Sequence, residues 1–140
     1  MEITTYNANQ TKSLAKQIAK QTKKGDILCL YGDLGSGKTT FTKYLVQYLG
    51  ISSKVQSPTF VIHRVYQKDE LVVHHFDLYR ISDKDQLHEI DLEEFLEENE
   101  SICFIEWPQI ALEVLKKYEH RVKNIKIEFI EGEVRKFIIN

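Results

Sequence analysis

The sequence predicts a three-layer α/β fold built around a mixed sheet, and two observations support this prediction. Residues 26–31 and 101–106 are short runs that are apolar apart from Asp26, Ser101 and Glu106 at their ends, as expected for buried parallel strands. Residues 59–76 and 123–139 each contain two β-rich runs separated by a polar turn, which is typical of antiparallel hairpins. A parallel core with added hairpins and intervening helical segments requires helices packed against the sheet.

The first half of the chain is expected to alternate strands and helices. The expected elements are a strand at Ile3–Tyr6, a helix ending near Gly25, the strand at residues 26–31, a helix at Thr40–Leu49 and a polar connection at Ile51–Ser57. Asn9 or Thr11 can cap the first helix, because their side chains accept hydrogen bonds from N–H groups at a helix start. The apolar stripe of this helix consists of Leu14, Ala15, Ile18 and Ala19. Gly50 is the expected stop of the second helix.

The second half of the chain combines hairpins with an acidic helical stretch. The expected elements are a hairpin of Thr59–Tyr66 and Leu71–Phe76, a mostly helical stretch at Lys84–Asn99, a strand at Ser101–Glu106, a short helix after Pro108, and a hairpin of Lys123–Ile130 and Glu133–Ile139. Residues 91–100 carry six acids. Such a run is usually a solvated helix face with its apolar residues packed inward, and a docking surface for a basic partner is the alternative.

Size, charge and cysteine content limit the classes of protein to consider. The 140 residues suffice for one domain, spanning residues 1–140, with a hydrophobic core. A formal net charge of -2 gives no general attraction to nucleic acid or anionic membranes. No run is apolar enough to span a bilayer and the N-terminus lacks signal-peptide features, so no membrane association is expected. Cys29 and Cys103 lie in apolar runs, and buried free thiols suit a cytoplasmic location, whereas a disulfide between them is less favoured.

A phosphate-binding loop is the strongest functional signal, because Gly32–Thr39 read GDLGSGKT and fit the pattern G-x-x-x-x-G-K-[ST]. Gly35 and Gly37 allow positive φ and a close approach of backbone N–H groups to phosphates at a helix N-terminus. Lys38 is expected to reach the β- and γ-phosphates, and the Thr39 hydroxyl to ligate Mg²⁺. The strand before the loop and the helix after it favour a P-loop NTPase-type fold over a glycine-rich turn with an incidental lysine. The residues of this segment expected to bind the nucleotide are Asp33, Leu34, Gly35, Ser36, Gly37, Lys38, Thr39 and Thr40.

Two carboxylates are candidates for the metal side of a nucleotide hydrolase. Such an enzyme needs an acid near the metal, usually at the C-terminal end of a buried strand beside the strand of the loop. Glu106 ends the apolar run ICFI, and Asp77 ends the run 71–76. Glu106 is the better candidate for a metal-side group or a base that orients water, and Asp77 is expected to assist it. The alternative for either acid is a helix cap or a salt bridge at a strand end.

The segment Ser57–Phe60 has two possible interpretations, and the histidines do not favour a metal site. Ser57–Phe60 occupies a position that often holds a switch loop sensing the γ-phosphate, but Pro58 also suits a simple turn into a strand. His74 and His75 are adjacent, so they point to opposite faces of a strand, and no third ligand is spaced to join either. We therefore expect no zinc site at the histidines.

The motifs GDLGSGKTT, SPTFVI, HFDLYR and IEWP occur in this order along the chain. In this they resemble the TsaE (YjeE) family, small bacterial ATPases that serve in threonylcarbamoyladenosine modification of tRNA. The resemblance covers nearly the whole chain. The phosphate loop is shared with many NTPases, whereas HFDLYR and the pair Glu106–Trp107 after an apolar strand are much more specific.

The resemblance implies ATP and Mg²⁺ as cofactors and weak hydrolysis by the isolated chain. It also implies association with TsaB and TsaD homologues. In that complex TsaD would transfer the threonylcarbamoyl group, and the ATPase would reset or assist TsaD. The chain would then contact tRNA only through the complex. Carried over to this sequence, Thr39, Glu106 and Asp77 would lie at or near the metal and Lys38 at the phosphates. Trp107 and the loop Ser57–Phe60 would flank the nucleotide or the partner. Thr11 and Arg135 are weaker candidates for nucleotide contacts.

Two other functions remain open from the sequence alone. A small-molecule kinase can carry the same phosphate loop, but it usually needs a substrate pocket and an arginine-bearing lid, and no Arg-rich helix pair is evident. A nucleotide-dependent binding module, whose output is association rather than turnover, is compatible with the first interpretation. Assays of ATP hydrolysis with and without partners, and of phosphoryl transfer to small acceptors, distinguish these functions.

Overall fold

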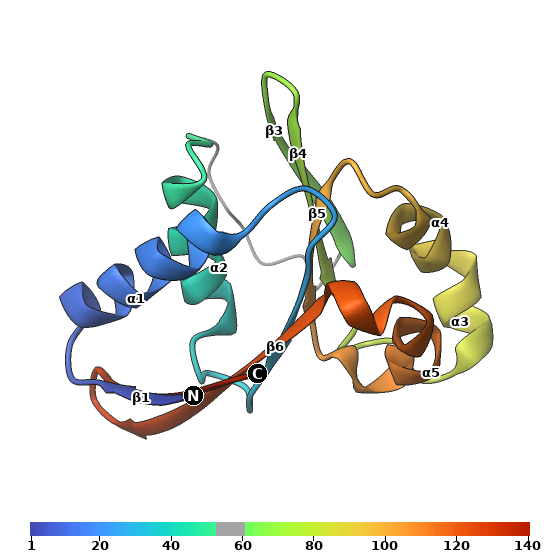
Figure 1. Ribbon diagram of the computed structural model, residues 1–140. Helices are drawn as coiled ribbons and strands as arrows, with labels where there is room; N and C mark the ends of the chain where they lie inside the picture. Colours follow the sequence, from blue (N-terminus) through green and yellow to red (C-terminus); the bar gives the residue numbers. More distant parts are fainter. Residues whose placement is uncertain (53–60) are drawn as a thin grey trace.

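The computed structural model describes residues 1–52 and 61–140, and in these residues seven strands form one mixed sheet (Figure 1). The strands are β1 (Glu2–Thr5), β2 (Ile27–Tyr31), β3 (His63–Lys68), β4 (Leu71–Asp77), β5 (Ile102–Glu106), β6 (Val122–Glu131) and β7 (Val134–Ile139). Their order across the sheet is β1-β7-β6-β2-β5-β4-β3. β2 pairs in parallel with β5 and β6, β4 pairs in parallel with β5, and the outer pairs are antiparallel.

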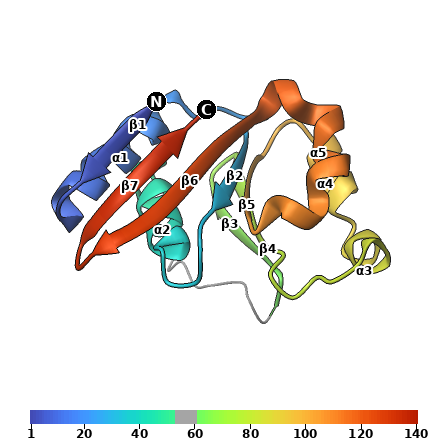
Figure 2. The same ribbon diagram turned by 90° about the horizontal axis from the view of Figure 1, so that it is seen from below.

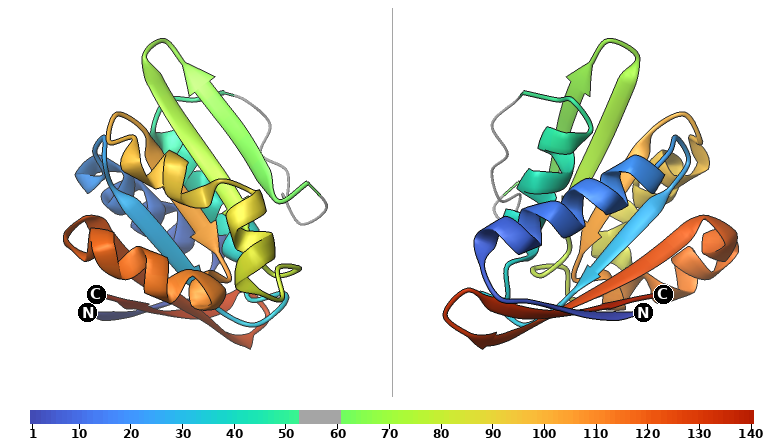
Figure 3. Two further views of the ribbon diagram at one scale, coloured as in Figure 1. Left: turned by 90° about the vertical axis from the view of Figure 1, so that its right-hand side faces the viewer. Right: turned by 60° about the vertical axis from the view of Figure 1, so that its left-hand side comes forward.

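Helices cover both faces of this sheet, which confirms the predicted three-layer α/β fold (Figures 1 and 3). One face is covered by α1 (Ala8–Gln21) and α2 (Lys38–Tyr48). The other face carries α3 (Lys84–Glu89), α4 (Leu92–Glu97), the 3₁₀ helix η1 (Pro108–Ala111), α5 (Leu112–Leu115) and the 3₁₀ helix η2 (Lys116–Arg121). Seen from below, β1, β7 and β6 lie side by side across α1 and α2, with the α3–α5 layer on the far side of β2 (Figure 2).

Alternating side chains of the central strands divide the core between the two faces. Leu28 and Leu30 of β2 pack with α1 and α2, whereas Ile27 and Cys29 pack with the α3–α5 layer. Each of these side chains is fully buried, because β2 is covered on both faces. Cys29 and Cys103 are free, as predicted, and burial raises the pKa of their thiols to about 12 and about 11. Both thiols therefore stay protonated at neutral pH.

The start and the end of α1 differ from the sequence prediction. Asn9 and Thr11 were wrong as caps, because the Asn7 side chain accepts the hydrogen bond of the Gln10 N–H group at 2.9 Å. Thr11 instead lies inside the helix, where its hydroxyl is 2.7 Å from that of Thr5. The helix ends at Gln21 rather than near Gly25, since the next residue takes an extended conformation.

Two later elements also have different bounds from those expected. The stretch expected to be mostly helical consists of two short helices, because Asp91 adopts a positive φ of 56° between α3 and α4. Strand β3 begins at His63, after a turn at Ile62 with φ 69°. The expected start of this strand at Thr59 lies outside the described residues.

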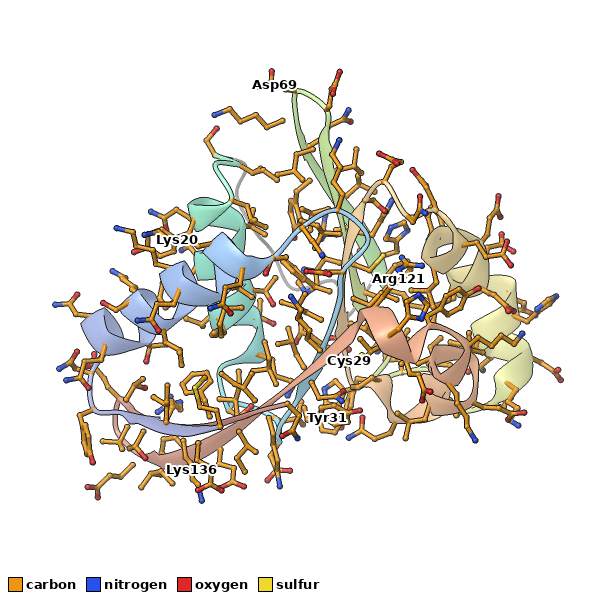
Figure 4. All side chains as sticks on the ribbon, in the orientation of Figure 1. Lys20, Cys29, Tyr31, Asp69, Arg121 and Lys136 are labelled. Carbon is orange, nitrogen blue, oxygen red and sulfur yellow. The ribbon has the colours of Figure 1, made fainter. Side chains whose placement is uncertain are left out.

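The two chain ends meet at one edge of the sheet. The amino terminus of Met1 donates to the Ile139 carbonyl at 2.8 Å (Figures 1 and 3). Figure 4 places Asp69, at the tip of the β3–β4 hairpin, and Lys136, on β7, at opposite ends of the molecule. In residues 1–52 and 61–140, no helix has the length and apolarity that crossing a bilayer requires.

Candidate nucleotide-binding site

The phosphate loop connects the C-terminal end of β2 to the N-terminus of α2, as the sequence predicts. Gly35 and Gly37 have φ of 79° and 110°, and Gly37 occupies the N-cap of α2 without a side-chain hydrogen bond to the helix. Because glycine has no side chain, Gly37 cannot cap the first N–H groups of α2 with one. A helix start without a side-chain cap favours the binding of an anion. A Cβ atom on Gly32 would lie 2.4 Å from Ser36 Oγ and 2.6 Å from the Ile127 carbonyl oxygen, so the loop closes tightly only around glycine.

Lys38 begins α2 and folds back over the loop. The residue is 5% exposed, and its Nζ donates to the carbonyl oxygens of Gly32 at 2.5 Å and Asp33 at 2.9 Å. The ammonium group also lies 4.5 Å from the centre of the Trp107 ring. Burial lowers the pKa of Lys38, and the nearby carboxylates of Glu106, Asp77 and Asp33 oppose this shift. A cation is therefore held at the loop by carbonyl oxygens and an aromatic face, within reach of an incoming phosphate.

The two carboxylates selected from the sequence lie side by side at the ends of adjacent strands. Asp77 of β4 is the register partner of Glu106 of β5, and both residues are almost fully buried. The Thr39 hydroxyl donates to the Glu106 carboxylate, at 3.2 Å from Oε1 and 3.3 Å from Oε2. Asp77 Oδ1 accepts the N–H group of Tyr79 at 2.9 Å. The fold thus brings the loop and both acids together at one end of the sheet.

A histidine that the sequence reasoning assigned to no site completes this cluster. His75 Nε2 lies 2.5 Å from Glu106 Oε2, and His75 Nδ1 lies 3.3 Å from the Tyr66 hydroxyl. Its neighbour His74 points to the other face, where it contacts His63 at 2.9 Å and Phe95. The opposite orientation of the two histidines was predicted from the alternation of the strand. The register that brings His75 to Glu106 was not.

The donor set fits a nucleotide with a hard divalent cation. Carboxylate and hydroxyl oxygens are the ligands that Mg²⁺ prefers, and Thr39, Glu106 and Asp77 provide them together. Ser36 Oγ is buried in the loop with no hydrogen-bond partner among the described residues, so the loop has unused polar capacity. In the part of the chain that the structure describes, no group of three His, Cys, Asp or Glu side chains forms a self-contained metal cluster. Phosphate oxygens would therefore have to complete the coordination of a cation.

Two hollows flank the phosphate loop. A cavity of about 180 Å³ lies on the α1 and α2 side, and the predicted residues Thr11, Ser36, Gly37, Thr40 and Arg135 line it. Arg135 Nε donates to the Ser36 carbonyl at 2.9 Å, which ties β7 to the loop. A cleft of about 940 Å³ lies beside the loop, and its lining includes Asp33, Leu34, Gly35, Trp107 and Phe129. The small cavity has the size and position for part of a nucleoside. The predicted loop Ser57–Phe60 lies outside the described residues.

Asp77 provides a first test of the site. Its replacement by alanine should lower ATP turnover per folded molecule by about tenfold or more, as expected on losing a group that assists a metal or water. Asp77→Asn is the matched variant, because it keeps an oxygen acceptor for the Tyr79 N–H group and loses only the charge. Both variants should lose turnover, while the alanine variant alone leaves this N–H unsatisfied, at a cost of about 1–3 kcal/mol in the free energy of unfolding. If the melting temperature falls but turnover per folded molecule stays normal in both variants, Asp77 is a structural cap and has no part in turnover.

Comparisons with known proteins agree with the fold and identify a family. A family model described as "Threonylcarbamoyl adenosine biosynthesis protein TsaE" matches residues 5–137. The crystal structure of YdiB from Bacillus subtilis matches with a TM-score of 0.71 and 30% sequence identity, covering 98% of this chain and 82% of that chain.

Curated relatives with the name "tRNA threonylcarbamoyladenosine biosynthesis protein TsaE" are similar over most of the chain. The protein from Bacillus subtilis is 41% identical over 111 residues, which are 79% of this chain and 68% of that protein. The protein from Rickettsia conorii is 36% identical, over 80% of this chain and 63% of that protein. The protein from Aquifex aeolicus is 33% identical, over 87% of this chain and 93% of that protein. The matched region thus falls just short of two thirds of the Rickettsia relative and nearly spans the Aquifex one.

Proposed function

The chain belongs to the TsaE family of threonylcarbamoyladenosine biosynthesis proteins, and from this we propose that it is a Mg²⁺-dependent ATPase of the bacterial tRNA-modifying machinery. Its role would be to assist or reset a transferase formed by TsaB and TsaD homologues. One observation supports the ATPase part above all. The hydroxyl of Thr39, the residue after the phosphate-loop lysine, donates a hydrogen bond to the buried carboxylate of Glu106 at the end of β5. This pair is what a nucleotide hydrolase needs beside its phosphate loop.

Each residue of the site has a role that follows from its position. The N–H groups of the loop and of the α2 N-terminus bind the phosphate chain, and Lys38 leaves the loop carbonyls to contact phosphate oxygens. Thr39, with Glu106 and Asp77 beside it, would hold Mg²⁺ directly or through water. When bound, Mg²⁺ neutralises phosphate charge and polarises the γ-phosphoryl group. Glu106 is the group placed to orient the attacking water or accept its proton.

The surroundings of the loop favour a partner that closes the site. Leu34, within the loop, is 68% exposed, and Phe129, which lines the same cleft, is 56% exposed. Large apolar side chains exposed around a polar site are typical of protein contact surfaces. Hydrolysis of a phosphoanhydride is faster when bulk water is excluded from the γ-phosphate, and a partner seated on this cleft can exclude it. We therefore propose that TsaB and TsaD homologues complete the site.

This proposal gives a direct test with partner proteins. ATP hydrolysis by the isolated chain should be slow and should rise by about tenfold or more when TsaB and TsaD homologues are added. A non-hydrolysable ATP analogue should strengthen the association, because nucleotide binding and assembly must be coupled reciprocally. Calorimetry or sedimentation with and without the analogue measures this coupling.

Full hydrolysis by the chain alone, with equal partner affinity in both conditions, would contradict the partner role. In that event, transfer of the γ-phosphoryl group to a small acceptor becomes the function to examine. Phe129→Ser is a useful variant here, because it removes an exposed apolar side chain from the same cleft, and Phe129 is not among the residues expected to bind the nucleotide. Its nucleotide affinity should match that of the unmodified chain, while its partner stimulation should fall.

A further inference from the structure

We propose that His75 is a positioning residue for Glu106, held on its other side by Tyr66; this inference rests on the proposed function. The chain of contacts runs from the Tyr66 hydroxyl through the His75 imidazole to the Glu106 carboxylate and on to the Thr39 hydroxyl. It connects the β3–β4 hairpin to the first turn of α2. His75 is 0% exposed and Glu106 is 2% exposed, so bulk water does not replace these contacts.

The chemistry of the groups assigns the direction of the bond to Glu106. A carboxylate oxygen only accepts, so the His75 Nε2–H group donates to Glu106 Oε2. A neutral imidazole accepts the Tyr66 hydroxyl at Nδ1, and a protonated one donates to that hydroxyl; the donation to Glu106 is the same in both cases. A second donor, the Thr39 hydroxyl, lies within hydrogen-bond distance of both oxygens of the same carboxylate. Glu106 is thus clamped between a residue of β4 and a residue of α2.

The two contacts on Glu106 are unequal, and this makes His75 the more important one. The bond from His75 is 2.5 Å long, whereas those from Thr39 are 3.2 and 3.3 Å. If the Thr39 hydroxyl is drawn to a metal, its bond to the carboxylate is weakened or lost. The contact from His75 Nε2 does not involve Thr39, so His75 can keep the carboxylate in place. A buried carboxylate left without such a donor would pay a large desolvation cost and could turn away from the loop.

Two explanations for His75 can be separated by the nitrogen that a substitution preserves. A positioning role requires a donor at the place of Nε2, whereas a purely structural role does not. In His75→Gln the amide nitrogen can reach the place of imidazole Nε2, so donation to Glu106 is preserved. In His75→Asn the amide nitrogen reaches only the place of Nδ1 and falls short of Glu106. The two variants are both neutral amides, and they differ by one methylene group. Their melting temperatures report the effect of this difference on packing, and a difference in kcat per folded molecule reports the contact with Glu106.

The test compares these variants in steady-state hydrolysis with the TsaB and TsaD homologues present. His75→Asn should lower kcat by about tenfold to a hundredfold, the usual effect of losing a residue that orients a metal-side group, with KM for ATP changed by less than about threefold. His75→Gln should keep kcat at least about fivefold above that of the Asn variant. The matched control is His74→Asn, which alters a neighbour that is also buried and contacts His63 on the other face. It should lower the melting temperature without lowering kcat per folded molecule.

A second measurement does not depend on turnover. Calorimetric titration of ADP at a series of Mg²⁺ concentrations gives the concentration of Mg²⁺ needed for half-maximal tightening of ADP binding. This concentration should rise about tenfold in His75→Asn and clearly less in His75→Gln. Equal kcat and equal Mg²⁺ dependence in the two variants, with only a lower melting temperature, would overturn the role of His75. An unmodified chain with neither partner-dependent turnover nor Mg²⁺-dependent ADP binding would instead overturn the proposed function itself, and this inference with it.

Discussion

Glu106→Gln should lower partner-stimulated ATP turnover by on the order of a hundredfold or more, while nucleotide affinity changes far less. Glutamine keeps the shape of the side chain and can still accept the Thr39 hydroxyl, but it carries no charge and is a poor base. The lost function is thus the orientation or activation of the attacking water and the charge beside the metal. Such interactions are strongest in the transition state, so their loss lowers kcat more than binding.

Single-turnover hydrolysis of ATP, measured beside equilibrium binding of a non-hydrolysable analogue, separates these two quantities. Glu97→Gln is the matched control, because Glu97 is an exposed glutamate of α4 on the opposite side of the sheet. It should leave both turnover and affinity at the level of the unmodified chain. If turnover of Glu106→Gln with partners present stays near that level, Glu106 is a structural residue and the proposed mechanism is wrong.

Lys38→Ala should weaken the binding of ATP with Mg²⁺ by about 1.5–3 kcal/mol, or roughly tenfold to a hundredfold. The removed contacts are charge-assisted hydrogen bonds from the ammonium group to phosphate oxygens. The structure adds a second reason, because Lys38 also bridges the carbonyl oxygens of Gly32 and Asp33 and so holds the loop in shape. Both effects act in the same direction on affinity.

Calorimetric titration with ATP and Mg²⁺ under non-hydrolysing conditions measures this loss. Lys43→Ala is the matched control, since Lys43 is an exposed lysine of the same helix. Its affinity should equal that of the unmodified chain. Wild-type affinity in Lys38→Ala would show that the loop does not bind phosphates through this lysine.

The phosphate loop and its two carboxylates were predictable because each depends on short-range sequence. Strand, glycine-rich turn and helix follow one another directly at β2 and α2, so tertiary structure has little opportunity to change the arrangement. Glu106 and Asp77 could be selected singly, as acids that end apolar runs. Their adjacency depends on the parallel pairing of β4 with β5, which was not predicted. Local patterns were sufficient to select the two acids, but not to place them side by side.

The rest of the arrangement depends on contacts between distant segments. The placement of β6 between β7 and β2, where it pairs in parallel with β2, joins residues far apart in sequence and leaves no local signal. Asn9 and Thr11 were the caps expected for α1 from the sequence, and Asn7 was not considered. In the folded chain the Thr11 hydroxyl is buried against Thr5, and Asn7 lies at the start of the helix and caps it.

The role of His75 was hidden for the same reason. The alternation of β4 places His75 on the same face as Asp77, and this could have been noticed in the sequence. Contact with Glu106, however, depends on the register between β4 and β5 and on the lengths of both side chains. A shift of this register by one residue would turn His75 away from the carboxylate.

Trp107 is the sole tryptophan of the sequence, and its position gives the molecule a spectroscopic property. Its indole ring lies 4.5 Å from Lys38 Nζ and 4.9 Å from the ring of Tyr79, at the edge of the cleft beside the phosphate loop. The emission of an indole depends on the charges next to it. The ammonium group of Lys38 lies against this ring, and it is expected to move when a phosphate binds. The intrinsic fluorescence of the unlabelled chain is therefore an optical reporter of the state of its phosphate loop, without contribution from a second tryptophan.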